Sequence, residues 1–219
     1  IRDSLETVMF TPTVYAPEVE LKKSEIQLSE PKFHHIKNVL RIRENSGINI
    51  SNGKGHIMYG KLKKNYVVIE KIKKFQKTND IKIFAPFLQD KNRFRYLIEK
   101  LVELNVSELY IGETRNTQKT KINIKKIDSW VISALEQSGS PFYPNIIYPK
   151  FLDFEIFDTC FDISGQKIID NNKKITNFAI GPEGGWSKDE LKNFKFKFKI
   201  TDFNLRSETA AITALTLTM

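Results

Sequence analysis

One stretch near the C-terminal end constrains the fold more than any other part of the chain. The apolar run 178–180 ends in a turn, residues 181–185, that contains three glycines, one proline and one carboxylate. Glycine permits positive φ and leaves backbone amides unshielded, while proline fixes φ. Ser187, followed three residues later by Glu190, forms a capping box that begins a helix. A strand, a glycine turn and a helix N-terminus in this order are typical of ligand sites in α/β proteins.

The rest of the second half alternates strands with helices. Residues 81–86 and 108–111 have the composition of strands, and residues around Trp130 have helical spacing. The positions that follow the first strand keep the i, i+3, i+4, i+7 spacing of one helical face: Phe94, Leu97, Ile98, Leu101 and Val102. The alternation predicts a largely parallel α/β sheet. Residues 194–200 alternate with period two, which predicts a strand with one buried and one exposed face.

The first part of the chain predicts a separate β-rich unit. Ser29-Glu30-Pro31 is a helix start, and Asn52-Gly53 is a hairpin turn, because both of its residues tolerate positive φ. Short strands are expected at residues 48–50, 57–59 and 66–69. These elements predict a small β-barrel. The polar residues 73–80 resemble a linker, so we expect domains at 1–75 and 80–219.

The charge balance indicates a polyanionic partner. Lys and Arg outnumber Asp and Glu by 35 to 26, which gives a net charge of +9 and a pI near 9.4. An excess of this size is typical of nucleic-acid-binding proteins. A Lys- and Asn-rich composition inherited from an A·T-rich genome would give the same excess with merely solvated lysines. Charge alone leaves both interpretations open.

The cysteine content and the hydropathy of the sequence predict a cytoplasmic protein. Cys160 is the only cysteine, so an internal disulfide and a Cys-based metal site are excluded. No apolar run reaches the roughly 18 residues of a membrane span, and residues 1–8 lack the apolar core of a signal peptide. The three histidines, His34, His35 and His56, are too scattered for a metal site, so we expect none.

Two features bear on the ligand of the glycine turn. Glu183 would repel a phosphate, and no P-loop lysine follows, so an uncharged or cationic ligand such as a sulfonium cofactor fits better. Further along, residues 205–209 combine a cation, an anion and two hydroxyls ahead of an apolar C-terminal segment. A helix start explains the hydroxyls and the carboxylate, but it does not explain Arg206.

Basic side chains mark a candidate RNA-binding surface. Four of them lie on or just after the first predicted helix and two lie in the second predicted domain: His35, Lys37, Arg41, Arg43, Arg93 and Arg115. Phosphate contacts and a solvated helix face explain them about equally well. Glu136 and Gln137 end the helix around Trp130. They either extend into solvent or face a cleft shared with the glycine turn, and spacing leaves both alternatives open.

The motifs together resemble a known family. Residues 181–185 (GPEGG) and 205–210 (LRSETA) resemble two motifs of the ribosomal RNA small-subunit methyltransferase E family, which belongs to the SPOUT class. The pair is specific, and the resemblance covers nearly the whole chain. Other family signatures are matched in order by residues 39–41 (VLR), 99–106, 114–115 and 136–139.

The resemblance implies both a fold and an activity. The fold is α/β, with a C-terminal SPOUT trefoil-knot domain and a small N-terminal PUA-like β-barrel. The cofactor is S-adenosylmethionine, and the reaction is methylation at N3 of a uridine in small-subunit (16S) ribosomal RNA, as a part of ribosome biogenesis. The partners are that RNA or the assembled small subunit, and a second copy in a homodimer whose active sites lie near the subunit interface.

The resemblance also implies roles for individual residues. We expect Arg206 to stabilise negative charge on the uracil oxygens or to position a phosphate, and Glu183 or Glu208 to organise the loops or assist proton removal. The catalytic candidates are Arg206 and Glu208. The expected cofactor-binding residues are Gly181, Pro182, Glu183, Gly184, Gly185, Ile200, Leu205, Ser207 and Thr209. The RNA-binding candidates are the six basic residues named above.

The chain departs from the family pattern in places. The family has Leu-Gly-x-Arg-Ile where residues 200–204 read ITDFN, so Thr201, Phe203 and Asn204 replace glycine, arginine and isoleucine. Ser140 stands where arginine is common, and Asn105 stands where Glu-Leu-Gly-Val has glycine. Two alternatives therefore remain. One is a catalytically impaired RNA-binding module for ribosome assembly. The other is a SPOUT methyltransferase that acts on a ribose hydroxyl or another RNA.

Overall fold

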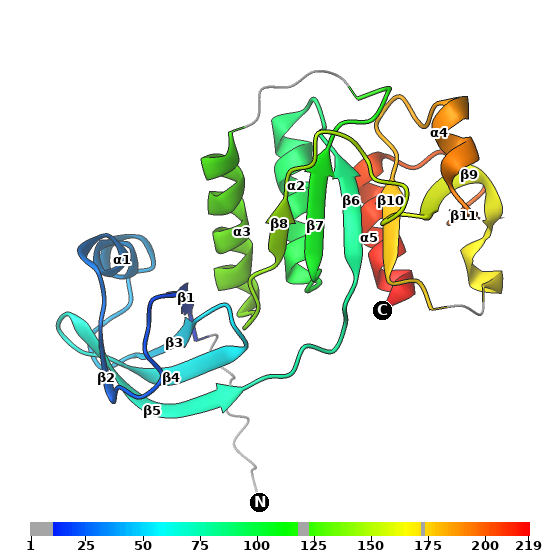
Figure 1. The fold of residues 1–219 in the computed structure, drawn as a ribbon. Coiled ribbons are helices and arrows are strands. Elements are labelled where there is room, and N and C mark those ends of the chain that lie inside the picture. The colour runs from blue at the N-terminus through cyan, green and yellow to red at the C-terminus, as the bar shows by residue number, and fades with distance from the viewer. Residues whose placement is uncertain (1–10, 118–122, 172–173) are drawn as a thin grey trace, which may run out of the picture. The chain divides into compact units, whose positions relative to one another are not determined.

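The chain forms two compact units in a computed structural model that describes residues 11–117, 123–171 and 174–219 (Figure 1). The first unit contains the residues up to Gln76 together with Leu135–Phe142. The second unit contains Lys77–Ala134 and Tyr143–Met219. The short segment 135–142 therefore belongs to the first unit, although it lies far from the rest of that unit in the sequence.

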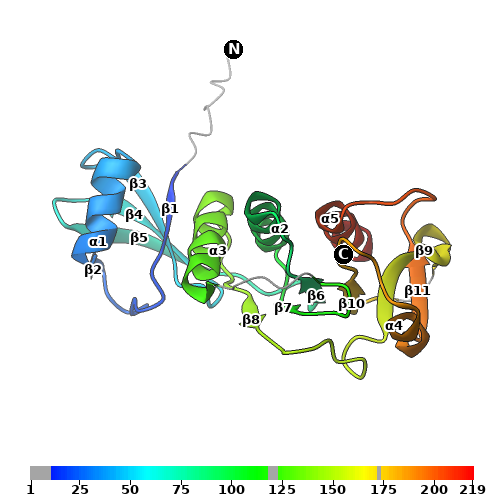
Figure 2. The same ribbon diagram turned by 90° about the horizontal axis from the view of Figure 1, so that it is seen from above.

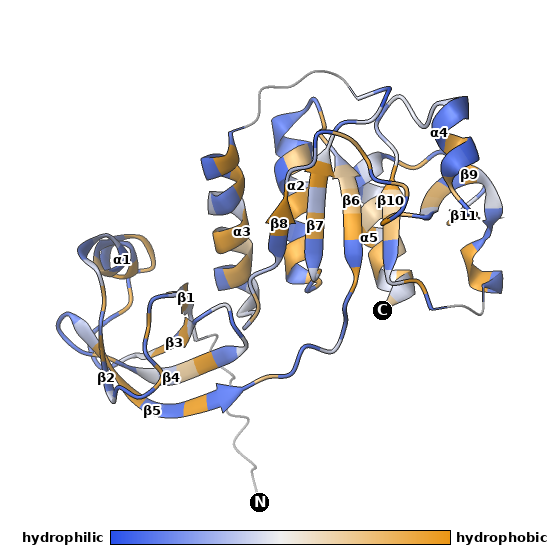
Figure 3. Ribbon diagram, viewed as in Figure 1, coloured by the Kyte–Doolittle hydropathy of each residue, from blue (hydrophilic) through white to orange (hydrophobic). Residues whose placement is uncertain are grey.

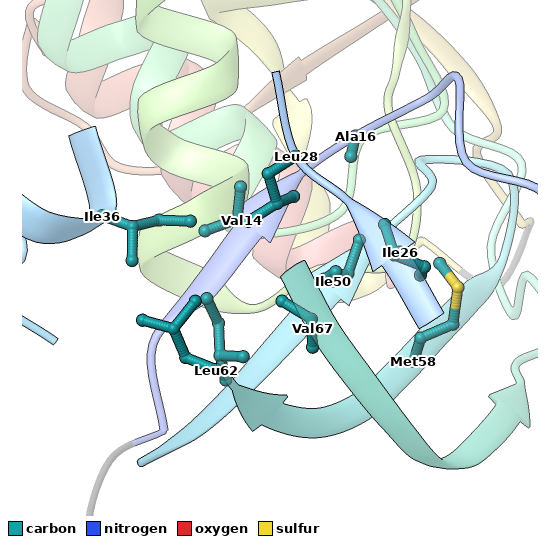
Figure 4. Close-up of a cluster of buried hydrophobic side chains, with 10 residues drawn as sticks. Val14, Ala16, Ile26, Leu28, Ile36, Ile50, Met58, Leu62 and Val67 are labelled. Atoms are coloured by element: carbon teal, nitrogen blue, oxygen red, sulfur yellow. The ribbon is translucent and has the colours of Figure 1, made fainter. Parts of the chain in front are cut away.

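The first unit is a five-stranded sheet with the strand order β1-β3-β4-β5-β2. β1 and β3 pair in parallel, and the other pairs are antiparallel. The sheet curls around a core that includes Val14, Ile36, Ile50 and Met58, as Figure 4 shows. This arrangement confirms the expected PUA-like unit. Its elements are β1 (Thr13–Tyr15), β2 (Glu25–Gln27), α1 (Glu30–His34), the π-helical turn η1 (His35–Val39), β3 (Gly47–Ser51), β4 (His56–Leu62) and β5 (Tyr66–Lys74).

Local signals explain two features of this unit. The hairpin between β3 and β4 forms because the Asn52 Oδ1 atom accepts the Lys54 and His56 N–H groups at 2.8 and 3.1 Å, and Gly53 adopts a φ of 68°. Ser29 is the N-cap of α1, as predicted, but its side chain makes no capping hydrogen bond. The helical stretch ends in the π-turn, and Arg41 then takes a left-handed φ of 53°.

The second unit is a six-stranded sheet with the order β11-β9-β10-β6-β7-β8. Every strand pair recorded between its described residues is parallel, which confirms the predicted α/β architecture. Its strands are β6 (Lys82–Pro86), β7 (Glu108–Gly112), β8 (Asn145–Ile147), β9 (Thr159–Lys167), β10 (Asn177–Ile180) and β11 (Phe196–Lys199). Its helices are α2 (Lys91–Glu103), α3 (Ile124–Ser138, ending in the first unit), the 3-10 turn η2 (Ile168–Asp170), α4 (Lys188–Asn193) and α5 (Ser207–Thr218).

The helices cover the sheet with their apolar faces. Figure 2 shows α2 and α5 on one face of the sheet and α4 on the other. The buried residues of α2 are the five that the helical spacing predicts. Asp90 begins this helix, because its carboxylate accepts the Asn92 and Arg93 N–H groups at 2.8 and 3.0 Å. The central strands are predominantly apolar (Figure 3), since they are covered on both faces.

The strand predicted for residues 194–200 is only partly correct. β11 is shorter, Phe196–Lys199, and Phe196 is 37% exposed while Phe198 is buried. The alternation fails because the partner on β9 jumps from Cys160 opposite Lys197 to Gln166 opposite Phe198. Such an irregularity bends the strand and changes the direction of its side chains. The β9 residues that it skips become part of the candidate site.

The departure at Asn105 has a structural explanation. Asn105 follows the C-cap residue of α2 at a left-handed φ of 59°, where glycine is favoured. Its Oδ1 atom is buried and, among the described residues, has no hydrogen-bond partner. We expect Asn105→Gly to raise the free energy of unfolding by about 1 kcal/mol, because it removes both penalties.

Urea unfolding of the wild-type protein and of the Asn105→Gly variant measures this difference in the free energy of unfolding. Asn45→Gly is a matched control, since Asn45 also has a positive φ but is exposed and accepts a hydrogen bond from the Lys63 Nζ atom. If Asn105→Gly raised the free energy of unfolding no more than Asn45→Gly does, this explanation would be contradicted.

Candidate functional site

The glycine turn and the segment after β11 line one pocket. Its volume is about 370 Å³, and it lies at the carboxyl ends of β10 and β11, where open α/β sheets bind ligands. Three sets of residues form it. They are Phe161, Asp162 and Ile163 from the irregular part of β9, residues 180–186 of the turn, and Lys199, Ile200, Thr201, Phe203, Asn204, Leu205, Ser207 and Ala210.

The glycine turn is held from several sides. Gly185 takes a left-handed φ of 68°, and its N–H donates to the Pro182 carbonyl oxygen at 2.8 Å. Asn116 donates its side-chain amide to the Gly184 and Gly185 carbonyl oxygens at 3.3 and 3.0 Å. A Cβ atom at Gly184 would lie 3.2 Å from the Asn116 Cβ atom, so glycine permits this close approach. The turn therefore has a fixed backbone.

The helix after the turn begins as the sequence predicts. The Ser187 Oγ atom accepts the Glu190 N–H at 3.3 Å, and the Glu190 Oε2 atom accepts the Ser187 N–H at 2.9 Å. This arrangement confirms the capping box. Trp186 is buried beside it, and the indole Nε1 group donates to the Phe161 carbonyl oxygen at 3.3 Å. The turn is thereby joined to β9, the third side of the pocket.

α5 is tied directly to the glycine turn. Its first residue, Ser207, is buried, and the Oγ atom donates to the Gly181 carbonyl oxygen at 2.8 Å. Arg206 is the N-cap residue of this helix. This hydrogen bond joins residues that are 26 positions apart in the sequence, so the two sequence motifs form a single structure.

Arg93 of α2 connects two carboxylates at the site. Its Nε and Nη2 groups donate to the two oxygens of Glu208 at 2.8 and 2.7 Å, and its Nη1 group donates to Glu183. The hydrogen bond from Arg93 lowers the pKa of Glu208 and raises that of Arg93 itself. Glu208 is buried, so this bidentate pair keeps it ionised in a partly desolvated position. Arg93 had been a candidate for RNA binding, but its guanidinium is occupied within the protein.

Arg206 differs from Arg93 in its surroundings. It is exposed, and no ion pair or side-chain hydrogen bond of its guanidinium is recorded with the described part of the chain. Its charge acts on Glu208 in the same direction as that of Arg93, although Arg93 has the larger effect on the Glu208 pKa. An unpaired guanidinium beside a pocket is suited to bind an anion or a developing negative charge.

The pocket brings together the expected cofactor residues with the exception of Thr209. That side chain is exposed on α5 and does not line the pocket, whereas Ala210 does. Sequence reasoning missed Phe161, Asp162 and Ile163, because no local motif marks them. The segment that departs from the family pattern also lines the pocket, and Phe203 is 77% exposed there.

The other basic candidates lie elsewhere. Lys37, Arg41 and Arg43 are exposed on or after η1 in the first unit, and His35 is half-buried there. Arg115 is in the second unit, where its guanidinium bonds to Asp189 at 2.9 Å and its N–H donates to the Glu190 Oε1 atom at 2.8 Å. Arg115 therefore contacts the start of α4 rather than the pocket.

Glu136 is not part of the pocket. Its Oε1 atom accepts the Tyr15 N–H at 2.9 Å, and its Oε2 atom lies 3.9 Å from the His35 Nε2 atom, all within the first unit. Burial raises the pKa of Glu136. Gln137 is exposed. Neither residue lines the pocket at the glycine turn. Glu136 instead attaches the end of α3 to β1.

The described ranges contain neither a metal-binding cluster nor a membrane-spanning helix. No group of three or more His, Cys, Asp or Glu side chains there is arranged to hold a metal ion. Among the described helices, none is both long enough and apolar enough to cross a membrane. Cys160 is buried, and burial raises the pKa of its thiol.

Comparison with known proteins assigns both parts of the chain. Residues 76–219 match the model of the RNA methyltransferase domain family, and residues 28–72 match that of the RNA methyltransferase PUA domain family. A ribosomal RNA small subunit methyltransferase E 2 from Borreliella burgdorferi is 30% identical over 209 residues, which cover 84% of this chain and 86% of that protein. A ribosomal RNA small subunit methyltransferase E from Rickettsia conorii is 28% identical over 220 residues, 89% of each chain.

A solved structure has the same fold. It is a ribosomal RNA small subunit methyltransferase E from Neisseria gonorrhoeae bound to S-adenosyl methionine. It superposes with a TM-score of 0.81 at 23% identity and covers 94% of this chain and 96% of its own. The fold, both domain models and the relatives agree with the two motifs that meet at the pocket. The chain therefore belongs to the ribosomal RNA small-subunit methyltransferase E family.

Proposed function

We propose that the chain uses S-adenosylmethionine to methylate N3 of a uridine in small-subunit ribosomal RNA. One observation carries this proposal: both family motifs contribute to the same pocket, which is lined by residues 181–185 of the first and by Leu205, Ser207 and Ala210 of the second. The cofactor in the Neisseria gonorrhoeae relative and the names of the relatives support it.

The residues of the pocket fit this cofactor. A volume of about 370 Å³ is within the usual range for small-ligand sites, roughly 300–1,000 Å³. Asp162 and Glu183 line it; Glu183 is paired with Arg93, so the Asp162 carboxylate is the group that favours a cationic ligand over a phosphate. The backbone groups of the glycine turn and of residues 200–205 would hold the polar ends of the molecule. Phe161 and Ile163 supply apolar contacts.

The bound cofactor supplies a methyl group that is already activated by its sulfonium charge. The protein must then orient the base and stabilise charge, since N3 of uridine belongs to a weakly acidic imide that gives up its proton to solvent water as it accepts the methyl group. We assign to Arg206 the stabilisation of negative charge on the uracil oxygens. We assign to Glu208 the organisation of the loop, because its lowered pKa and its two bonds to Arg93 make it a poor proton acceptor.

Most of the RNA contacts in this proposal lie in the first unit. His35, Lys37, Arg41 and Arg43 would contact the phosphate backbone, and Arg115 would do so in the second unit. A homodimer with active sites near the subunit interface, and a cytoplasmic location, are parts of the same proposal. They rest on membership of the family and on no contact described above.

Transfer to purified ribosomal particles tests the proposal. Small subunits from a strain that lacks this protein, or naked RNA from them, are incubated with the protein and S-adenosylmethionine that carries a labelled methyl group. We expect label in small-subunit RNA and none in large-subunit RNA. Calorimetry in parallel should find one cofactor bound per chain. Cofactor binding without transfer to either substrate would favour the impaired RNA-binding module, and absence of binding would overturn the proposal.

A further inference from the structure

We propose that Arg93 is a positioning residue that fixes the first turn of α5 against the glycine turn and so presents Arg206 to the target base. The inference deepens the proposed function and rests on it. It also replaces the expectation that Arg93 binds RNA.

The first turn of α5 is held at two consecutive residues. Ser207 donates to the Gly181 carbonyl oxygen at 2.8 Å, and Glu208 accepts both of its bonds from Arg93 at 2.7–2.8 Å. Arg206 immediately precedes them as the N-cap residue, with φ −67° and ψ 149°. The position of the Arg206 backbone is therefore fixed by two neighbouring contacts. Ser207 bonds to the loop after β10, and Glu208 bonds to α2. Of the described residues 206–208, only Arg206 has an exposed side chain.

Arg93 is itself well placed to act as an anchor. Its N–H is bonded to the N-cap carboxylate of Asp90 at 3.0 Å. The next residue, Phe94, is buried and packs edge-on against Phe87 and Trp130, with ring centroids 5.7 and 6.1 Å apart. Groups that support a functional residue are most effective on such rigid elements.

The charges at the site separate the roles of the two arginines. Arg93 pairs with both Glu183 and Glu208, so a phosphate contact would require it to release a bidentate carboxylate. The Glu208 side chain is only 9% exposed and would then be a buried charge without a partner. Arg206 forms no ion pair with the described residues, so it can contact the substrate without breaking one. The positioning function therefore belongs to Arg93 and the contact with the substrate to Arg206.

Four variants test this division: Arg93→Ala, Arg93→Lys, Glu208→Gln and the control Arg95→Ala. Arg95 lies on the same helix but is exposed, and its one ion pair with the described residues is with Glu99, at i+4. We expect Arg93→Ala to lower kcat about 100-fold, the usual effect of a misplacement near 1 Å, with an unchanged RNA Kd and an unchanged salt dependence of that Kd. Arg93→Lys should recover part of kcat, because lysine keeps the charge but not the bidentate geometry.

A double variant and an exchange measurement complete the test. Adding Glu208→Gln to Arg93→Ala should cost no further activity, since both changes break the same pair. Amide hydrogen exchange at residues 207–210 should be faster in Arg93→Ala and unchanged in Arg95→Ala, and this readout does not require turnover.

The possible failures are distinguishable. If the wild-type protein does not transfer methyl groups, the proposed function fails, while hydrogen exchange still tests the anchor. If wild-type turnover is normal, an unchanged kcat in Arg93→Ala would overturn the inference. A weaker RNA Kd with a smaller salt slope at constant kcat would overturn it in favour of RNA binding. A general loss of folding in Arg93→Ala leaves Arg93→Lys and Glu208→Gln, both of which must lower kcat more than Arg95→Ala for the inference to stand.

Discussion

Arg206→Ala should lower kcat about 100- to 1,000-fold, the range found when one group that stabilises a developing negative charge is removed. The cofactor Kd should change little, because the contacts proposed for Arg206 are with the RNA base and the pocket is lined by its neighbours Leu205 and Ser207. The protein should also remain folded, since the Arg206 side chain is exposed and has no recorded partner among the described residues.

Single-turnover kinetics with excess enzyme separates these effects. Arg206→Lys should retain part of the rate, because it keeps the positive charge without the planar guanidinium. Arg95→Ala, a removal of arginine at a position outside the pocket, provides the control. Wild-type turnover in Arg206→Ala with cofactor bound would show that the catalytic assignment is wrong.

Phe157→Ala should lower the free energy of unfolding by about 3–5 kcal/mol, the usual cost of a large cavity in a core. Phe157 is fully buried and packs edge-on against Phe84 and Tyr110, with ring centroids 6.0 and 5.0 Å apart. The same cluster contains Trp186, which follows the glycine turn. The loss should therefore also weaken cofactor binding.

Urea denaturation measures the first effect and calorimetry measures the second. Phe151→Ala is the matched control, since Phe151 is 62% exposed and its removal should cost less than about 1 kcal/mol. Equal decreases in the free energy of unfolding for Phe157→Ala and Phe151→Ala would contradict this account of the core.

Local pattern was sufficient to predict several of the regular elements. The spacing along α2 identifies its buried face, because helical periodicity and burial are consequences of the same geometry. The capping box at Ser187 and the hairpin at Asn52 also form from groups that are close in the sequence. The glycine turn is also a local feature, and its composition predicts a ligand site, which the proposed function assigns to S-adenosylmethionine.

The parts that were not predicted depend on residues distant in the sequence. Arg93 and Glu208 are 115 residues apart, and Tyr15 and Glu136 are 121 residues apart. Periodicity indicates which side of an element is buried, but it does not indicate which side chains meet across elements. The irregular part of β9 was missed for a similar reason, because the β9 residues that β11 skips are defined by the register between these two strands. A knot has no local signal either, so that expectation came from the family resemblance alone.

The identity of the methylated atom tests the central claim most directly. Small-subunit RNA methylated by the wild-type protein is digested to nucleosides and analysed by mass spectrometry, with Arg206→Ala as the comparison. The account predicts 3-methyluridine as the new nucleoside, formed by the wild-type protein and strongly reduced in the variant. A new ribose-methylated nucleoside, or no new methylated nucleoside in the wild-type reaction, would contradict it.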